Sequence, residues 1–151
     1  MLREHDFLLR LSLCRGLGRV AKYRLWCCAH QLHCYDDLPR LIEQCQLTLR
    51  AQTALLNNWA SPELDRAVNL NQGYPHITIV DPEYPAVLRE IFCPPLVLFY
   101  AGNLTLLQRP CLGVVGARDA SSYGAGVLRG FIPEIVKHQL VVVSGLARGI
   151  D

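Results

Sequence analysis

Two glycine-rich loops near the end of the sequence contain the residue types that bind phosphate groups. The first loop, residues 116–121, and the second loop, residues 144–151, each follow a short apolar run. Glycine lets a backbone approach a ligand closely, and the arginines of the loops, Arg118 and Arg148, can pair with an anion. Loops at the carboxyl ends of neighbouring parallel strands form an anion pocket at one edge of an α/β sheet. The sequence therefore predicts a phosphate-binding site.

A strand-to-helix turn with a solvated arginine would account for the first loop alone. The second loop favours a ligand, because right-handed connections between parallel strands bring both loops to the same edge of the sheet. The first loop lacks the G-x-G-x-x-G spacing of dinucleotide-binding folds, so no nicotinamide cofactor is predicted. The residues predicted to bind phosphate are Gly116, Arg118, Ser121, Ser122, Ser144, Gly145, Arg148 and Gly149.

A predicted β–α–β unit positions these two loops. Apolar runs predict strands at 112–115 and 140–144, and the pattern between them predicts a helix over 121–138. Pro133 lies inside this helix and should kink or interrupt it, at a cost of about 3 kcal/mol. Since the sequence stops at Asp151, where a covering helix should begin, we expect a fragment of a longer protein.

The rest of the sequence predicts two domains. Helical patterns fill residues 1–71, which are expected to form an all-helical domain. Strand patterns begin after residues 72–75, so an incomplete α/β domain is expected over 74–151, with further strands at 76–80 and 96–101. The predicted helix N-caps are Asp36 or Asp37, Thr48 and Ser61.

Composition and charge limit the function classes. The chain has 151 residues, 51% of them hydrophobic, and its net charge of +2 creates no global field that attracts nucleic acid. The first thirty residues are locally basic. An odd number of cysteines without a C-x-x-C pair or a signal peptide predicts reduced, buried thiols in a cytoplasmic protein. No apolar run reaches the roughly 18–20 residues that a membrane span requires.

Metal and catalytic motifs are weak in this sequence. Cys27, His30 and Cys34 share a helical face, but structural zinc sites usually take their ligands from two separated pairs, so no metal is predicted. The serines of the two loops have no histidine and acid in a recognisable nucleophile arrangement, and G-x-S-x-G is absent from the sequence. No catalytic residue is predicted.

A second candidate site for contact with a nucleic-acid phosphate lies in the basic N-terminal region. Residues 16–18, Gly-Leu-Gly, separate two predicted helices, as in helix-hairpin-helix motifs, whose hairpin amides hold a backbone phosphate. Such a turn is also the simplest way to reverse direction between packed helices, so both roles stay open. The candidate secondary DNA contacts are Arg15, Gly16, Gly18, Arg19 and Lys22.

Taken together, these motifs resemble the signature blocks of the DprA/Smf family. The matching segments are 114–118, 122–124 and 144–151, preceded by Tyr-Pro at 84–85 and Pro-Pro at 94–95. The resemblance implies a SAM-like helical domain followed by the first part of a Rossmann-like DNA-binding domain. It also implies a phosphate pocket of Gly116, Ala117 and Arg118, flanked by Ser144, Gly145, Arg148 and Gly149.

The resemblance further implies a function without catalysis. Members of the family bind single-stranded DNA in the cytoplasm and load RecA onto it in natural transformation, and we expect a homodimer for the full-length protein. Ala117 departs from the serine that the family often has, which removes one hydroxyl donor. Two alternatives stay open: an enzyme of a related fold that hydrolyses nucleoside phosphates, which needs an acid or base near the glycines, and a helical protein-docking module.

Overall fold

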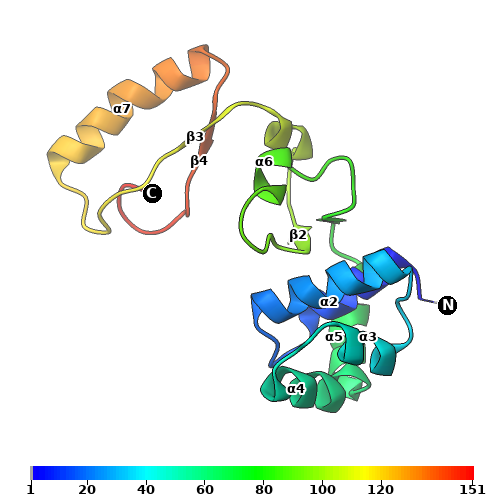
Figure 1. Cartoon of the computed structure of the whole chain (residues 1–151). Helices are drawn as coiled ribbons and strands as arrows, with labels where there is room; N and C mark the ends of the chain where they lie inside the picture. Colours follow the sequence, from blue (N-terminus) through cyan, green and yellow to red (C-terminus); the bar gives the residue numbers. More distant parts are fainter. Residues whose placement is uncertain (1) are drawn as a thin grey trace. The chain divides into compact units, whose positions relative to one another are not determined.

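The computed structural model describes residues 2–151, which form two compact units, residues 2–102 and 103–151 (Figure 1). The architecture is mixed α/β, as the sequence predicts. Among residues 2–151, no helix is both long enough and apolar enough to cross a membrane. The seven cysteines are all free thiols; four are buried, whereas Cys111 is exposed and departs from the expectation of buried thiols.

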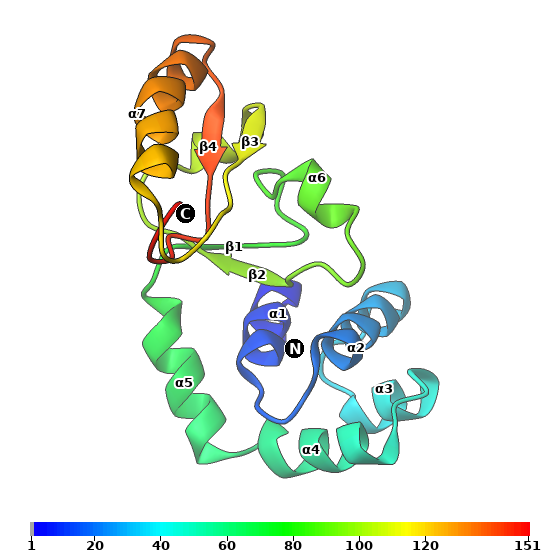
Figure 2. The same cartoon turned by 90° about the vertical axis from the view of Figure 1, so that its left-hand side faces the viewer.

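Five helices make up most of the first unit. The predicted caps Asp37, Thr48 and Ser61 each accept a hydrogen bond from a backbone amide of the helix that follows them. Helix α1 is central to the core, because four of its ten residues are buried between the neighbouring helices (Figure 2). The helices are α1 (Glu4–Leu13), α2 (Arg19–Leu32), α3 (Leu38–Gln44), α4 (Leu49–Trp59) and α5 (Pro62–Gln72).

An antiparallel strand pair completes the first unit. Strand β1 (His76–Thr78) pairs with β2 (Val97–Phe99), and both strands pack against α1. The change from helices to strands falls where the sequence predicts it, but the division between the compact units follows Gly102. The physical reason is that both strands pack against α1, where Ile77 and Thr78 are buried.

The connection between β1 and β2 is held by a buried tyrosine. It contains the short helix α6 (Ala86–Arg89), and Tyr84 in front of that helix is 1% exposed. The Tyr84 hydroxyl donates a hydrogen bond to the carbonyl oxygen of Pro95 at 2.7 Å. The Tyr-Pro and Pro-Pro motifs are therefore joined by one hydrogen bond, and burial raises the pKa of Tyr84 to about 12.

The second unit is a β–α–β unit preceded by the short 3₁₀ helix η1 (Leu104–Gln108). Strands β3 (Cys111–Gly113) and β4 (Val141–Val143) are parallel, with Leu112 opposite Val142. Helix α7 (Ser122–Lys137) connects them and packs against β4.

Of the two expected effects of Pro133, a kink or an interruption of α7, the interruption was wrong. Helix α7 is continuous from Ser122 to Lys137 and includes Pro133. Pro133 is exposed, as is Arg129 four residues before it, so water can reach the backbone carbonyl of Arg129, which has no amide partner in the helix.

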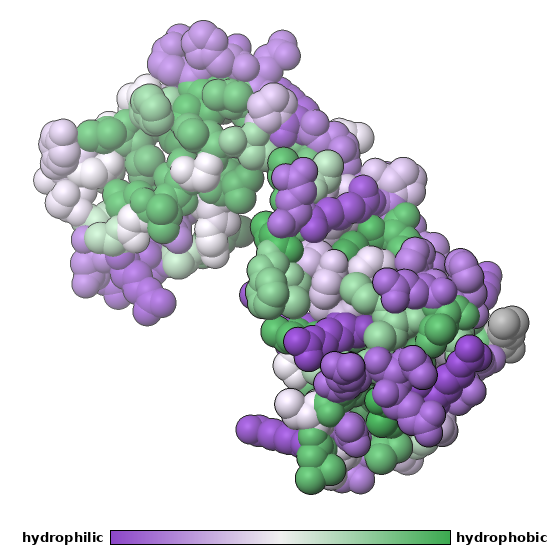
Figure 3. Space-filling model, in the orientation of Figure 1, coloured by the Kyte–Doolittle hydropathy of each residue, from purple (hydrophilic) through white to green (hydrophobic). Residues whose placement is uncertain are grey.

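Much of the apolar surface of the second unit is uncovered. Figure 3 shows hydrophobic residues at the surface of this unit. A two-stranded sheet with one helix has too few elements to bury both faces of every element. The large exposed apolar residues of the second unit include Val115, Val127, Phe131, Val136, Val143 and Leu146.

Candidate nucleic-acid interface

The two glycine-rich loops lie side by side at one edge of the β3–β4 pair. The parallel pairing continues past the strands, since the Val114 amide donates to the Val143 carbonyl at 2.8 Å. Farther out, the Ile150 amide donates to the Ala117 carbonyl at 3.1 Å, which joins the second loop to the first. The predicted convergence of the two loops is therefore confirmed.

Two glycines make this close approach possible. Gly149 has φ +108°, and a Cβ atom there would lie 2.1 Å from the Ala117 carbonyl oxygen. A Cβ atom on Gly116 would lie 2.6 Å from the Cβ of Ile150. Real side chains do not approach this closely, so both positions require glycine for packing between the loops. Sequence reasoning gave these glycines a ligand, or for the first loop a strand-to-helix turn, and missed their packing against the other loop.

The inner part of the site is filled by Asp151. Its Oδ1 accepts a hydrogen bond from the Gly116 amide at 2.8 Å, and its backbone oxygen accepts one from the Ser144 hydroxyl at 2.7 Å. The Ser144 oxygen also accepts from the Leu146 amide at 3.1 Å, and a Cβ atom on Gly145 would lie 3.1 Å from Asp151 Oδ2. These polar groups are engaged within the protein. An incoming phosphate therefore meets a carboxylate at this point rather than a free amide.

The outer rim of the loops contains the positive charge. The Arg118 side chain is exposed, and no group within residues 2–151 forms a hydrogen bond or ion pair with it. Arg148 Nη2 lies 2.8 Å from Asp119 Oδ1, and both side chains are more than four-fifths exposed. A pair this exposed contributes little free energy, so a phosphate can compete with Asp119 for Arg148.

The start of α7 adds backbone donors to this rim. Ser121 caps the helix, because its hydroxyl oxygen accepts from the Gly124 amide at 3.1 Å. Ser122 begins the helix, and the first turn contains no acidic residue. The positive end of the helix dipole and its unpaired first amides therefore remain available to an anion. Ala117 is exposed and contributes its carbonyl oxygen to contact between the loops, as described above.

The five candidate residues around the α1–α2 turn do not form a single site. Lys22 is half-buried, and its ammonium group donates to the Ser12 carbonyl at 2.5 Å. Burial lowers the pKa of Lys22. This lysine therefore joins the end of α1 to α2. Gly16 has φ +76°, and its added Cβ would meet Ala54 at 3.0 Å, so it serves helix packing. Arg15 and Arg19 are exposed, and Gly18 precedes α2.

Acidic and metal-binding groups near the loops are few. The two loops contain the carboxylates of Asp119 and Asp151 and no histidine. Within the described part of the chain, no group of three or more histidine, cysteine or acidic side chains could hold a metal ion. Sequence reasoning gave Asp151 at most the role of a lone acid and did not consider Asp119. The residue type alone does not show whether an aspartate hydrogen-bonds within the protein or is solvated.

Comparisons with known proteins match this chain to DNA-processing proteins. It is 46% identical over 80 residues to the DNA processing protein DprA of Streptococcus pneumoniae, over 53% of this chain and 28% of that protein. It is 42% identical over 93 residues to the DNA processing protein DprA of Bacillus subtilis, over 60% of this chain and 31% of that protein. The chain thus spans about three tenths of the length of these curated relatives.

A solved structure and a family profile agree with these sequence matches. The X-ray structure of DNA processing protein A from S. pneumoniae superposes with a TM-score of 0.79 at 28% identity, over all of this chain and 51% of that one. The profile of the family described as DNA recombination-mediator protein A matches residues 75–151, which is just over half of the chain. The resemblance inferred from the loop motifs is confirmed, and the chain belongs to the DNA recombination-mediator protein A family.

Proposed function

We propose that this chain is part of a recombination mediator that binds single-stranded DNA through its phosphates, independently of sequence. The observation that carries the proposal is the placement of Arg118 and Arg148 on adjacent loops at one edge of the β3–β4 pair, both exposed. Phosphates would bind the outer rim of the loops, together with Ser122 and the first amides of α7. The glycines and Asp151 would hold the loops in position.

The rim also offers a surface on which bases could stack. Tyr123, the second residue of α7, is 80% exposed, and Leu146 of the second loop is 90% exposed. Stacking on an aromatic ring contributes about 1–3 kcal/mol per base and tolerates any sequence, because every base has a π-face. Arginine contacts to phosphates together with stacking on one tyrosine fit an unpaired strand better than a duplex, whose bases are covered.

We further propose that the protein transfers the bound strand to a RecA-type recombinase during transformation, in the cytoplasm, and that the full-length protein is a homodimer. The family description and the names of the relatives support a role in DNA processing and recombination. We also infer that the second unit is the first part of a Rossmann-like sheet. Its parallel β–α–β order supports this, and further strands and helices would cover its exposed apolar residues.

The direct test is binding of a fluorescein-labelled oligothymidylate, followed by anisotropy as a function of salt concentration. Binding should weaken steeply as salt increases, because each contacted phosphate of a single strand contributes about 0.7 to the slope of log K against log salt. The Arg118→Gln variant should bind more weakly and lower this slope by about 0.7. Arg129→Gln is the matched control, since Arg129 is an exposed arginine of α7 with no side-chain partner among residues 2–151.

Two results would contradict the phosphate mechanism. The first is affinity that stays constant between low and high salt. The second is equal loss of affinity in the Arg118→Gln and Arg129→Gln variants, which would indicate a general effect of charge.

Hydrolysis of a nucleoside phosphate remains the second candidate, because the carboxylate of Asp151 lies against the Gly116 amide. Incubation with nucleoside triphosphates and detection of released phosphate separates the two functions. Release that is abolished by Asp151→Asn would replace our proposal with the enzymatic one.

A further inference from the structure

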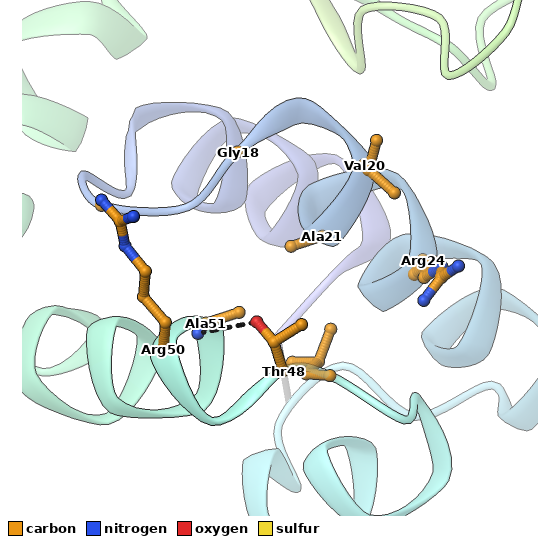
Figure 4. A pocket seen from close by; sticks show the side chains of 9 residues that line it. Gly18, Val20, Ala21, Arg24, Thr48, Arg50 and Ala51 are labelled. Carbon is orange, nitrogen blue, oxygen red and sulfur yellow. Dashed lines mark hydrogen bonds between the residues drawn. The ribbon is translucent and has the colours of Figure 1, made fainter.

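A basic pocket lies within the first unit, between the beginnings of α2 and α4. Its volume is about 380 Å³. In Figure 4, Arg24 of α2 and Arg50 of α4 lie at opposite ends of the pocket, with Ala21, Thr48 and Ala51 between them. No aspartate or glutamate is among the described residues that line it.

The electrostatics of this pocket favour an anion. Gly18 and Thr48, the residues before α2 and α4, both line the pocket, so the positive ends of two helix dipoles face it, and neither first turn contains an acidic residue. Arg50 is the second residue of α4, where a cation is repelled by the helix dipole. Within residues 2–151, neither Arg24 nor Arg50 has a side-chain hydrogen bond or ion pair. A bound anion would satisfy both the guanidinium groups and the helix ends.

Backbone donors at the start of α2 are also available. Gly18 is the N-cap residue of this helix and has no side chain, so it accepts no side-chain hydrogen bond from the first amides of α2. An added Cβ on Gly18 would meet no atom within 4 Å, so packing does not require glycine there. By contrast, Thr48 caps α4 by accepting a hydrogen bond from the Ala51 amide at 3.3 Å. The absence of a side chain at Gly18 leaves the α2 amides open to a ligand.

Neighbouring basic hollows of the first unit differ from this one. Arg15 and Arg66 line a hollow that also contains Glu63, whose charge opposes binding of an anion. The hollow lined by Arg19 contains Lys22, whose ammonium already donates to a backbone carbonyl. In the pocket between α2 and α4, positive charge is neither paired nor offset by an acid.

We propose that this pocket binds a phosphodiester group of single-stranded DNA, which gives the first unit its own contact with the nucleic acid. The inference rests on the proposed function and adds a second site to the rim of the two loops. A volume near the lower end of the usual range for ligand pockets, about 300–1,000 Å³, suits a phosphate with part of its sugar. No aromatic side chain is among the described lining residues, so the contact does not depend on base identity.

The test uses the full chain, labelled with ¹⁵N, titrated with an oligothymidylate and, separately, with inorganic phosphate. We expect the oligonucleotide to shift the amide signals of residues 19–21 and 50–51. The double variant Arg24→Gln/Arg50→Gln should lose these shifts, bind the oligonucleotide about five- to tenfold more weakly at low salt, and lower the salt slope by about 0.7–1.4. Both arginines are exposed and lack side-chain partners, so the variant should fold, which circular dichroism checks.

The matched control is Arg40→Gln/Arg66→Gln, which removes the same charge from two exposed arginines outside the pocket. Equal weakening by both double variants overturns the proposal in favour of a general charge effect. Shifts at Gly116 and Arg118 without shifts at residues 19–21 overturn the pocket but keep the proposed function. Shifts at residues 19–21 alone keep the pocket and remove the loop rim. Shifts with inorganic phosphate but not with DNA show that the pocket takes free phosphate, which also overturns the proposal.

Discussion

Replacing Gly149 with alanine tests whether the two glycine loops hold each other in place. The added Cβ would lie 2.1 Å from the Ala117 carbonyl oxygen and 2.6 Å from the Arg118 Cα, which are both backbone atoms that a rotamer change cannot move. The φ of +108° also lies in a region that a residue with a side chain rarely adopts. Such backbone strain costs about 1–3 kcal/mol, and relief of the overlap by a backbone shift adds about 1–3 kcal/mol. We therefore expect the second unit to lose about 2–6 kcal/mol of unfolding free energy.

Amide hydrogen exchange is the suitable assay, because a melting curve of the whole chain would mix the responses of two units. The Ile150 and Val114 amides report on the loops and on the strand pairing, since their acceptors are Ala117 and Val143. A loss of about 2–6 kcal/mol corresponds to exchange roughly 30- to 20,000-fold faster, at about 1.4 kcal/mol for each factor of ten.

The control for this substitution is Gly126→Ala. Gly126 lies within α7, and an added Cβ there would meet no atom within 4 Å, so alanine should stabilise the helix by about 0.5–1 kcal/mol. If the Gly149→Ala variant exchanged within threefold of the unchanged protein, the close packing of the two loops would not contribute to the stability of this unit.

Two further predictions concern the first unit. Burial alone would raise the pKa of Glu4, but hydrogen bonds from His30 and Trp26 outweigh it and lower this pKa below its ordinary value of 4.5. The carboxylate therefore stabilises the fold above about pH 4.5, and this contribution disappears as the pH falls through the lowered pKa. Glu4→Gln should cost about 1 kcal/mol at pH 7 in urea unfolding followed by tryptophan fluorescence, because Trp26 and Trp59 are the two tryptophans of the chain and both lie in the first unit. The difference should vanish in acid, and a constant difference would contradict the assignment. Tyr84→Phe should cost about 1–2 kcal/mol in the same assay, because the Pro95 carbonyl loses its donor, and unchanged stability would show that water replaces the hydroxyl.

Local signals in the sequence predict most of the secondary structure. Asp37, Thr48 and Ser61 each place an oxygen where the first amides of a helix need an acceptor, so three helix starts can be recognised without tertiary information. The two apolar runs on either side of α7 likewise predict a parallel pair of strands, because a helix between two strands is the usual crossover connection of parallel strands. Pro133 removes one helical hydrogen bond but does not end α7, because Arg129 and Pro133 are exposed and water can reach the carbonyl that loses its amide partner.

Tertiary contacts decide what local signals leave open. The sequence changes character at residues 72–75, yet β1 and β2 stay with the helices because α1 offers them an apolar surface. Lys22 belongs to a basic cluster in the sequence, but its ammonium is half-buried against the Ser12 carbonyl. Arg50 is distant in sequence from Gly16 and Gly18, with which it lines the pocket between α2 and α4. Neither charge pattern nor spacing indicates these partners.

The glycine-rich motif combines two roles that the structure separates. Gly116 and Gly149 are needed because Ile150 and the backbone of Arg118 come too close for a side chain. The arginines of the same loops are exposed at the rim, where a phosphate can reach them. The Ala117 side chain is exposed and takes no part in the contact between the loops. The contact that joins the loops there comes from the Ala117 carbonyl, which accepts from the Ile150 amide, and any residue supplies that group. A residue without a hydroxyl at position 117 therefore leaves both the loop packing and the exposed guanidinium groups intact.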